Sequence, residues 1–467
     1  MGVTGNGHPH PRARRPITAG GATVNASRGD ADRDVTDVVA GDVVAGDVVA
    51  GDGVAGDAVG GGALARCLDI PAAQFAAENW GRAPRLTRAA DGRDFRDLFD
   101  ERAVDELVSE RGLRTPFLRM AKDGNVLPGH RFTRSGGSGA TIADQVADDK
   151  VLALLADGAT LVLQALHRTW PPLVRFGSTL AAELGHPAQI NAYVTPPQNQ
   201  GFAAHYDTHD VFVLQVSGRK RWRVHEPVLV DPLPEQNWER YAAQVAARAG
   251  EEPLIDTVLE PGDALYLPRG YLHSAAALGD LTIHLTVGVH PVSRNSLLRQ
   301  LVLIAADDAD LRASLPMGVD LADPAVLGAH VAATAQALAD FADNLTPAQS
   351  DTVALQVGAT LAENTRPEPI GPLAQGAAAA ALTGLTPLRA RAGLRWALST
   401  DADHAVLRVL DKTVTMPVGA DTALKAVLSG GAFTPAELPV LDPDAQLALA
   451  RQLLREGVVV PAQTPMA

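Results

Sequence analysis

The 467-residue sequence contains a single cysteine, Cys67. One cysteine can neither form a disulfide within the chain nor build a cysteine-ligated zinc site, and it fits a reducing compartment. Runs of lysine and arginine long enough to serve as a nucleic-acid arm are also absent, and the formal net charge is −14. Because non-specific DNA binding depends on neutralising phosphates, this charge argues against direct DNA binding, although it allows docking on a basic protein.

Long apolar segments are scarce as well. No apolar run approaches the roughly 20 residues that a membrane-spanning helix needs. The N-terminus carries Arg12, Arg14 and Arg15, but no hydrophobic segment follows them, as a secretory signal would require. We therefore expect a cytoplasmic protein that does not associate with a membrane.

Composition divides the chain into four parts. Residues 1–62 include the unit Val-Val-Ala-Gly-Asp, repeated with a period of five from Val38. This period matches neither a helix nor a heptad, so we interpret the segment as a disordered low-complexity tail, with a small β-rich repeat as the alternative. Residues 63–297 have a globular composition, residues 298–375 predict helices rich in alanine and leucine, and residues 376–467 alternate predicted strands and helices.

The first half of the globular region predicts mixed elements. Residues 94–111 and 144–155 have apolar positions at helical spacing. The Asp-Gly pair at 123–124 lies between two predicted strands and is typical of a hairpin turn. A further amphipathic helix is predicted over residues 171–184, and it ends at Gly185 because glycine is favoured at helix C-termini.

Five strand-like segments follow one another in the second half of that region. They are QINAYVTPP, FAAHYDTHDVFVLQV, RKRWRVHEP, DALYLPRGYLHSAAAL and LTIHLTVGVHPV. Turn residues separate them, which predicts an antiparallel sandwich or small barrel. Two sheets that face each other leave a mouth into which inward side chains project.

The C-terminal part suggests a winged-helix shape, because helices are followed by a short hairpin. Residues 366–378 contain three prolines and are predicted to be a linker before it. From Gly376 onward the sequence contains eight lysines and arginines and eight aspartates and glutamates. This balance is a poor electrostatic footprint for DNA, so we favour a structural or protein-docking role.

His205 and Asp207 lie two residues apart at the start of a predicted strand. Residues i and i+2 of a strand share one face, so this pair can converge on one metal ion. Two histidines and one carboxylate, with other positions open, are the ligand pattern of non-haem Fe(II) oxygenases. A second histidine is therefore needed to complete such a site.

Several histidines could supply the third ligand: His209, His225, His273, His284 and His290. His209 is too near in sequence to close the other side of an ion, and His225 lies in a basic strand. His273 ends the segment PGDALYLPRGYLH, in which two turns frame a strand and bring the chain back toward the first pair. We therefore predict His273, with His284 as the alternative.

A cosubstrate such as 2-oxoglutarate would chelate iron through its C1 carboxylate and keto oxygen, and its far carboxylate needs a cation. Lys220 lies 15 residues after His205, on the strand that follows a Ser-Gly turn. Trp222 and Val224 lie two and four residues further along the strand, so they share the face of Lys220 and make it apolar. The arginines that flank Lys220 should point outward. A lone inward lysine requires an anionic partner.

These motifs resemble those of a known family. NAYVTPP, HYDTHDVFVLQVSGRKRWRV, PGDALYLPRGYLH and LTIHLTVGVH are similar to segments of the JmjC-type ribosomal oxygenases. The resemblance implies a mainly β catalytic core over residues 63–297, a double-stranded β-helix or jelly-roll of the JmjC cupin type. It further implies a helical dimerisation region over residues 298–375, hence a homodimer, and a winged-helix-like α/β module over 376–467.

The resemblance also implies roles for individual residues. His205, Asp207 and His273 would bind Fe(II), and Lys220 would bind the distal carboxylate of 2-oxoglutarate. Eukaryotic-type members of the family resemble this chain in using lysine there, whereas the bacterial arginine hydroxylases use arginine.

Asn191 and Tyr193 share one face and match positions near the cosubstrate in that family. They could donate hydrogen bonds to it, or they could be a turn asparagine and a buried tyrosine without such a role.

The reaction implied consumes 2-oxoglutarate and O2, releases succinate and CO2, and hydroxylates a histidine or arginine side chain of a ribosomal protein. An acidic enzyme surface suits a basic loop of such a substrate. Two alternatives stay open. One is an iron- and 2-oxoglutarate-dependent enzyme that acts on methyl-lysine or a small metabolite. The other is a non-catalytic cupin that serves as a binding module.

Overall fold

The computed structural model describes residues 49–52, 62–89, 92–122, 124–139, 141–197 and 203–462. Most of the predicted N-terminal tail therefore lies outside the described residues, as does residue 123 of the hairpin turn. The hairpin itself is confirmed, because β3 (Leu118–Lys122) and β4 (Asn125–Val126) pair antiparallel on either side of that turn.

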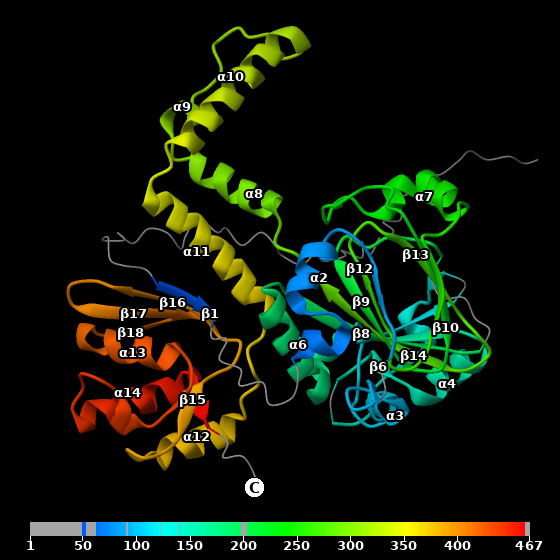
Figure 1. Ribbon diagram of the computed structural model, residues 1–467, viewed down its shortest axis with the longest axis horizontal. Helices are drawn as coiled ribbons and strands as arrows, with labels where there is room; N and C mark the ends of the chain where they lie inside the picture. The colour runs from blue at the N-terminus through cyan, green and yellow to red at the C-terminus, as the bar shows by residue number, and fades with distance from the viewer. Residues whose placement is uncertain are drawn as a thin grey trace, which may run out of the picture. The chain divides into compact units, whose positions relative to one another are not determined.

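A large antiparallel sheet lies at the centre of the globular region (Figure 1). Within the described residues its strand order is β2-β12-β9-β14-β8-β7-β3-β4. Its other strands are β2 (Arg85–Thr87), β7 (Thr160–Leu163), β8 (Ala188–Thr195), β9 (Asp210–Ser217), β12 (Ala264–Leu267) and β14 (Thr282–Val289). Alternation gives the sheet two different faces. In β8, Ile190, Ala192 and Val194 enter the main apolar core, whereas Asn191 and Tyr193 line a cavity on the opposite face.

A second antiparallel sheet faces the cavity side of the first. It has the order β11-β10-β13, with bounds Ile255–Leu259, Lys220–His225 and Leu272–Ala277. Apolar side chains of both sheets meet between them, including Val213 from β9, Leu265 from β12 and Trp222 from β10. The predicted antiparallel β core is therefore confirmed, with inward side chains of two sheets directed into one space.

Helices pack on the other face of the large sheet, where their apolar residues complete the main core. These helices are α1 (Ala63–Cys67), α2 (Ala72–Glu78), α3 (Glu101–Ser109), α4 (Asp148–Ala156), α5 (Leu166–Thr169) and α6 (Pro171–Leu184). Helix α6 ends as predicted, with Gly185 in the left-handed region at φ 71°. Further elements outside this core are η2 (Gly129–Arg131), η3 (Trp238–Tyr241) and α7 (Ala242–Ala249).

Two of these helices begin later than the sequence predicted. Helix α3 begins at Glu101 because Asp100 caps it, accepting a hydrogen bond from the Ala103 amide at 2.8 Å. Helix α4 begins at Asp148 because β6 (Gln145–Val146) pairs with β5 (Thr133–Arg134) just before it.

Residues 294–364 contain four helices, α8 (Arg294–Ala305), α9 (Ala309–Arg312), α10 (Pro324–Asp343) and α11 (Pro347–Asn364). The sequence had predicted helices over residues 298–375, and α9, α10 and α11 lie within that range. Among the described residues, α10 is long and apolar enough to cross a membrane by length and composition, and none of it is buried. The expectation that no apolar run reaches this length was therefore wrong. One such helix is weak evidence that a protein crosses a membrane, because helices of soluble proteins can also pass this test of length and composition.

The C-terminal residues form an α/β module with its own apolar core. Its elements are α12 (Pro372–Ala380), β15 (Leu388–Ala390), β16 (Arg395–Thr400), β17 (His404–Val409), β18 (Lys412–Pro417), η4 (Val418–Ala420), α13 (Asp421–Leu428), β19 (Ala432–Phe433), η5 (Pro435–Glu437), α14 (Pro443–Arg455) and β20 (Val459–Pro461). Strands and helices alternate in this module, as the sequence predicted. The winged-helix assignment stays a prediction.

Two predictions about segments flanking this module need correction. The predicted linker is half helical, since α12 covers its second half and the buried Gln375 side chain donates to the Leu454 and Val459 carbonyls. In the tail, β1 (Val49–Asp52) pairs antiparallel with β16, so the four described residues of the repeat form a strand rather than a disordered segment.

Candidate metal centre

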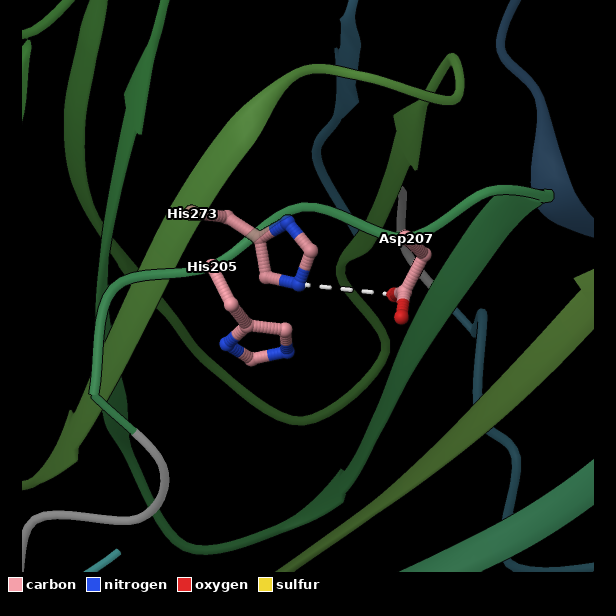
Figure 2. Close-up of side chains that lie close together, drawn as sticks. All are labelled: His205, Asp207 and His273. Carbon is pink, nitrogen blue, oxygen red and sulfur yellow. Dashed lines mark ion pairs between the residues drawn. The ribbon is translucent and has the colours of Figure 1, made fainter. Parts of the chain in front are cut away.

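Three side chains from two separate segments converge at one end of the cavity between the sheets. One ligand atom of each of His205, Asp207 and His273 lies within 4.8 Å of the others. His273 Nε2 is 3.6 Å from Asp207 Oδ2, and Figure 2 shows the three side chains directed toward a common point. The structure thus brings together the three residues that the sequence proposed as metal ligands.

The sequence had predicted that His205 and Asp207 lie at the start of a strand, but the structure places them outside it. Strand β9 begins only at Asp210, and His205 and Asp207 occupy the loop before it. His205 N donates to His273 O at 3.1 Å, and His273 N donates to His205 O at 2.8 Å. Gly270 N donates to Asp207 O at 3.0 Å. The pair is therefore held by backbone bonds to the chain around β13, rather than by the regular pleat of one strand.

Backbone carbonyls set the orientation of both imidazoles. His205 Nδ1 lies 2.7 Å from Ala203 O, and His273 Nδ1 lies 3.1 Å from Tyr271 O. A carbonyl can only accept a hydrogen bond, so each Nδ1 carries a proton and, in the neutral ring, Nε2 is the nitrogen left to bind a metal. Such an outer bond is typical of histidines that bind metals.

Electrostatics favour the metal-binding forms of His273 and Asp207. Burial, followed by neighbouring His205, lowers the pKa of His273 to about 4, so its ring is neutral at pH 7. Burial opposes ionisation of Asp207, but His209, His273 and His205 together hold its pKa below the ordinary value. Neutral imidazoles and an ionised carboxylate are what a divalent metal requires. Two nitrogens and one oxygen with an open side fit Fe(II).

Beyond the three residues, the cavity of about 240 Å³ continues between the sheets to Lys220. Lys220 is 3% exposed, and its ammonium donates to Thr195 Oγ1 at 3.3 Å. Burial alone lowers its pKa to about 7. The predicted alternation around Lys220 is confirmed, because the flanking Arg219 and Arg221 are exposed and pair with Asp280 and Asp256.

The sheet register gives the length of this cavity. Val224 pairs with His273, and Lys220 lies four residues further along β10. At about 3.3 Å per residue this is roughly 13 Å along the strand. A lysine side chain and a five-carbon diacid can together span that length, so the residues present fit 2-oxoglutarate between a metal and Lys220.

Asn191 and Tyr193 lie on the cavity wall formed by β8. Asn191 Oδ1 accepts a hydrogen bond from Ala165 N at 3.1 Å, so its NH2 group is left to donate into the cavity. The ring of Tyr193 stacks on His284, with centroids 5.0 Å apart.

His284, the alternative third ligand, is not part of the metal-ligating group among the described residues. It lies deeper, where its ring also contacts Trp222 edge-on at 5.5 Å. Burial, followed by the charge of Lys220, lowers its pKa well below the ordinary value. Its Nδ1 and the Trp222 Nε1 are buried and have no hydrogen-bond partner among the described residues.

Sequence reasoning missed two features of the cavity wall. Arg119 on β3 joins it because Arg119 and Tyr193 both pair with Val162, a register that the sequence does not reveal. His209, dismissed as a ligand, stacks on His290 with centroids 4.9 Å apart. Its ring covers Gly288, where an added Cβ would lie 2.6 Å from His209 Cδ2.

Comparisons with known proteins match the part of the chain that holds this site. A family model for the JmjC domain matches residues 171–297. Ribosomal oxygenase 1 of Gallus gallus is 32% identical over 271 residues, which are 54% of this chain and 42% of that protein. The human protein of the same name is 31% identical over 223 residues, covering 47% and 33%. The chain therefore matches less than half the length of these relatives.

A further relative and two solved structures are also similar. The bifunctional lysine-specific demethylase and histidyl-hydroxylase NO66 of Drosophila erecta is 46% identical over 102 residues, covering 21% of this chain and 15% of that protein. The Escherichia coli ribosomal oxygenase YcfD is 20% identical, with a TM-score of 0.48, covering 85% and 99%. Another structure of YcfD, with cobalt and 2-oxoglutarate, has a TM-score of 0.46 at 20% identity, covering 84% and 98%.

Proposed function

We propose that this chain is an Fe(II)- and 2-oxoglutarate-dependent protein hydroxylase. It contains a JmjC domain and is homologous over that region to the ribosomal oxygenases. The observation that carries this proposal is the convergence of His205, Asp207 and His273 at one end of a cavity with a buried lysine at its other end. The jelly-roll arrangement of the two sheets belongs to the same proposal.

Each part of the cavity has a task in this reaction. When bound, Fe(II) and 2-oxoglutarate supply the oxidation of an unactivated C–H bond by O2, with succinate and CO2 as coproducts. His205, Asp207 and His273 would hold the metal from one side and leave the cavity side for cosubstrate and O2. Lys220 and the Thr195 hydroxyl would hold the distal carboxylate. Apolar residues such as Trp222 would exclude water from the reacting groups.

The charges of the cavity favour histidine over arginine as the side chain that is hydroxylated. Asp207 is the one carboxylate among the described residues lining the cavity, and the metal would use it. Arg119 and Lys220 supply positive charge there. A buried guanidinium or methylated ammonium needs an anionic or aromatic partner that is not already engaged. A neutral imidazole can instead bond to the Asn191 amide.

The test is turnover on ribosomal proteins. Purified full-length protein with Fe(II), 2-oxoglutarate and air is incubated with ribosomal proteins, and mass spectrometry measures the gain of one oxygen atom. We expect hydroxylation of a histidine in a basic loop, and its loss in His205→Ala. Formaldehyde release would favour a demethylase, in line with the name of the NO66 relative. Absence of 2-oxoglutarate decarboxylation with every substrate would favour a non-catalytic binding module.

The buried lysine predicts a pH dependence of cosubstrate binding. Since the Lys220 pKa is about 7 in the free cavity, the ammonium loses its proton above pH 7. Bound carboxylate raises that pKa again, so binding at higher pH must take up one proton. We expect the affinity for 2-oxoglutarate to fall roughly tenfold per pH unit between pH 7.5 and 9. Calorimetry in buffers with different ionisation enthalpies measures both the affinity and the proton uptake; a flat profile would contradict the prediction.

The remaining expectations extend this proposal. A homodimer is supported by apolar side chains that α8 leaves exposed, such as Leu298, Val302 and Leu303. The whole chain's partners, its domain limits at residues 63–297, 298–375 and 376–467, and a cytoplasmic location without membrane or direct DNA binding stay part of the proposal.

A further inference from the structure

The three candidate ligands come from segments that are far apart in the sequence. His205 and Asp207 lie in the loop before β9, and His273 lies in β13. Backbone bonds join the two segments at the His205–His273 bridge and between Gly270 N and Asp207 O. The separation of the ligands therefore depends on how firmly the loop is held against the turn that precedes β13.

The side chain of Asp210, the first residue of β9, connects that loop to that turn. It is 1% exposed. Its Oδ1 accepts a hydrogen bond from Arg269 N at 3.1 Å, and its Oδ2 accepts one from the Tyr266 hydroxyl at 2.6 Å. The Arg269 guanidinium lies 3.8 Å from Oδ1 and supplies the opposite charge. Burying a carboxylate is costly unless it is paired and hydrogen-bonded, so these contacts together keep Asp210 in place.

Tyr266 extends this connection to the N-terminal part of the domain. Its hydroxyl donates to Asp210 and accepts a hydrogen bond from Gly81 N at 2.9 Å. Its ring packs edge-on against Phe75, with centroids 4.8 Å apart, and is stacked with Trp80 at 6.0 Å. The hydroxyl thus has one hydrogen-bond donor and one acceptor as partners, and packing holds the ring. Together they fix the direction of the hydroxyl.

We propose that Asp210 and Tyr266 are positioning residues for the metal centre, an inference that rests on the proposed function. Neither belongs to the metal-ligating group or lines the cavity. They act by fixing the ligand loop against the turn at Arg269. An ionised carboxylate suits this task because two donors approach two different oxygens. An asparagine has one side-chain oxygen and would turn its NH2 toward one of the donors.

Two conservative variants and one matched control test the proposal. Asp210→Asn and Tyr266→Phe each remove part of the connection and keep the shape of the side chain. Tyr271→Phe is the control, because its hydroxyl also bonds the N-terminal segment, donating to Arg82 O at 2.8 Å, without touching Asp210. The substitution keeps the Tyr271 backbone carbonyl that orients His273. Cobalt(II) is titrated into the metal-free full-length proteins, and visible absorption measures both affinity and coordination. Thermal unfolding with and without cobalt reports on the fold.

We expect Asp210→Asn to weaken cobalt binding by about 10- to 100-fold and to change the cobalt spectrum, with about a 10-fold loss in Tyr266→Phe. Tyr271→Phe should stay within about twofold of the wild type. An equal loss in the control, or wild-type affinity and spectrum in both test variants, overturns the proposal. If Asp210→Asn does not fold, Tyr266→Phe decides, since it removes one oxygen atom and leaves the ring packing. A wild-type protein that binds no cobalt would refute the proposed function itself, whereas equal binding by wild type and variants refutes only the positioning role.

Discussion

Replacing Lys220 with methionine is expected to stabilise the protein without cosubstrate and, at the same time, to weaken 2-oxoglutarate binding strongly. Methionine fills a similar buried volume without a charge. Removing one partner of a buried charge pair costs about 2–5 kcal/mol, so the affinity should fall about 30-fold or more. Metal binding should be retained, because Lys220 is not part of the metal-ligating group.

The gain in stability follows from the sign of the pKa change. Burial lowers the Lys220 pKa from 10.5 to about 7, so between these values the unfolded chain binds more protons than the folded one. Stability therefore rises with pH across this window, and the burial of the charge is most costly below pH 7. The methionine variant should gain on the order of a few kcal/mol there, and little near pH 10.5.

Anaerobic titration of 2-oxoglutarate into the metal-loaded proteins and thermal unfolding at pH 6.5 measure the two effects. Lys150→Met is the matched control, because its ammonium bonds the Thr133 carbonyl at 2.7 Å outside the cavity. Wild-type cosubstrate affinity in Lys220→Met would refute the assigned role of the lysine. A loss of both affinity and stability would indicate a structural role instead.

Replacing His273 with alanine is expected to abolish metal binding and turnover together. The loss should exceed the roughly 10- to 100-fold decrease that follows removal of an outer partner of a metal ligand. The fold should persist, because the bonds that join residue 273 to His205 come from the backbone and not from the imidazole. Metal analysis after dialysis and the rate of succinate formation measure the result.

His284→Ala is the comparison for this variant, since it too removes a buried imidazole with a lowered pKa. We expect this protein to bind metal like the wild type, while its cosubstrate affinity changes through the contact of His284 with Tyr193. If His284→Ala loses the metal and His273→Ala keeps it, the alternative third ligand is correct and the assignment of His273 is wrong.

The sequence predicted those parts of the site that follow from local alternation and turns. In KRWRVH, parity alone put Lys220 inward and the arginines outward, and the two turns around Ala264–Leu267 brought His273 back to the first pair. Parity failed for His205 and Asp207, which meet beside His273 through backbone bonds outside any regular strand. The sequence did not reveal the roles of Arg119, Asp210 and Tyr266, because their partners come from other strands. The composition of one strand does not determine the register in which it pairs with its neighbours.

Fold elements were missed for related reasons. The start of α3 depended on the cap that Asp100 provides, since the apolar residues before it have helical spacing too. Helix α12 was hidden by prolines that lie at or before its first turn, where proline is tolerated. Most of the remaining predicted elements had either a strict period or a clear stop residue, as α6 has in Gly185.

The ring of His209 occupies the space that any side chain at position 288 would need. The two positions therefore cannot vary independently, although they lie far apart in the sequence. A larger residue at 288 would displace the imidazole, and a small residue at 209 would leave a hollow beside Asp207. A protein that changes only one of the two positions therefore has either a displaced imidazole or a hollow in this wall of the cavity.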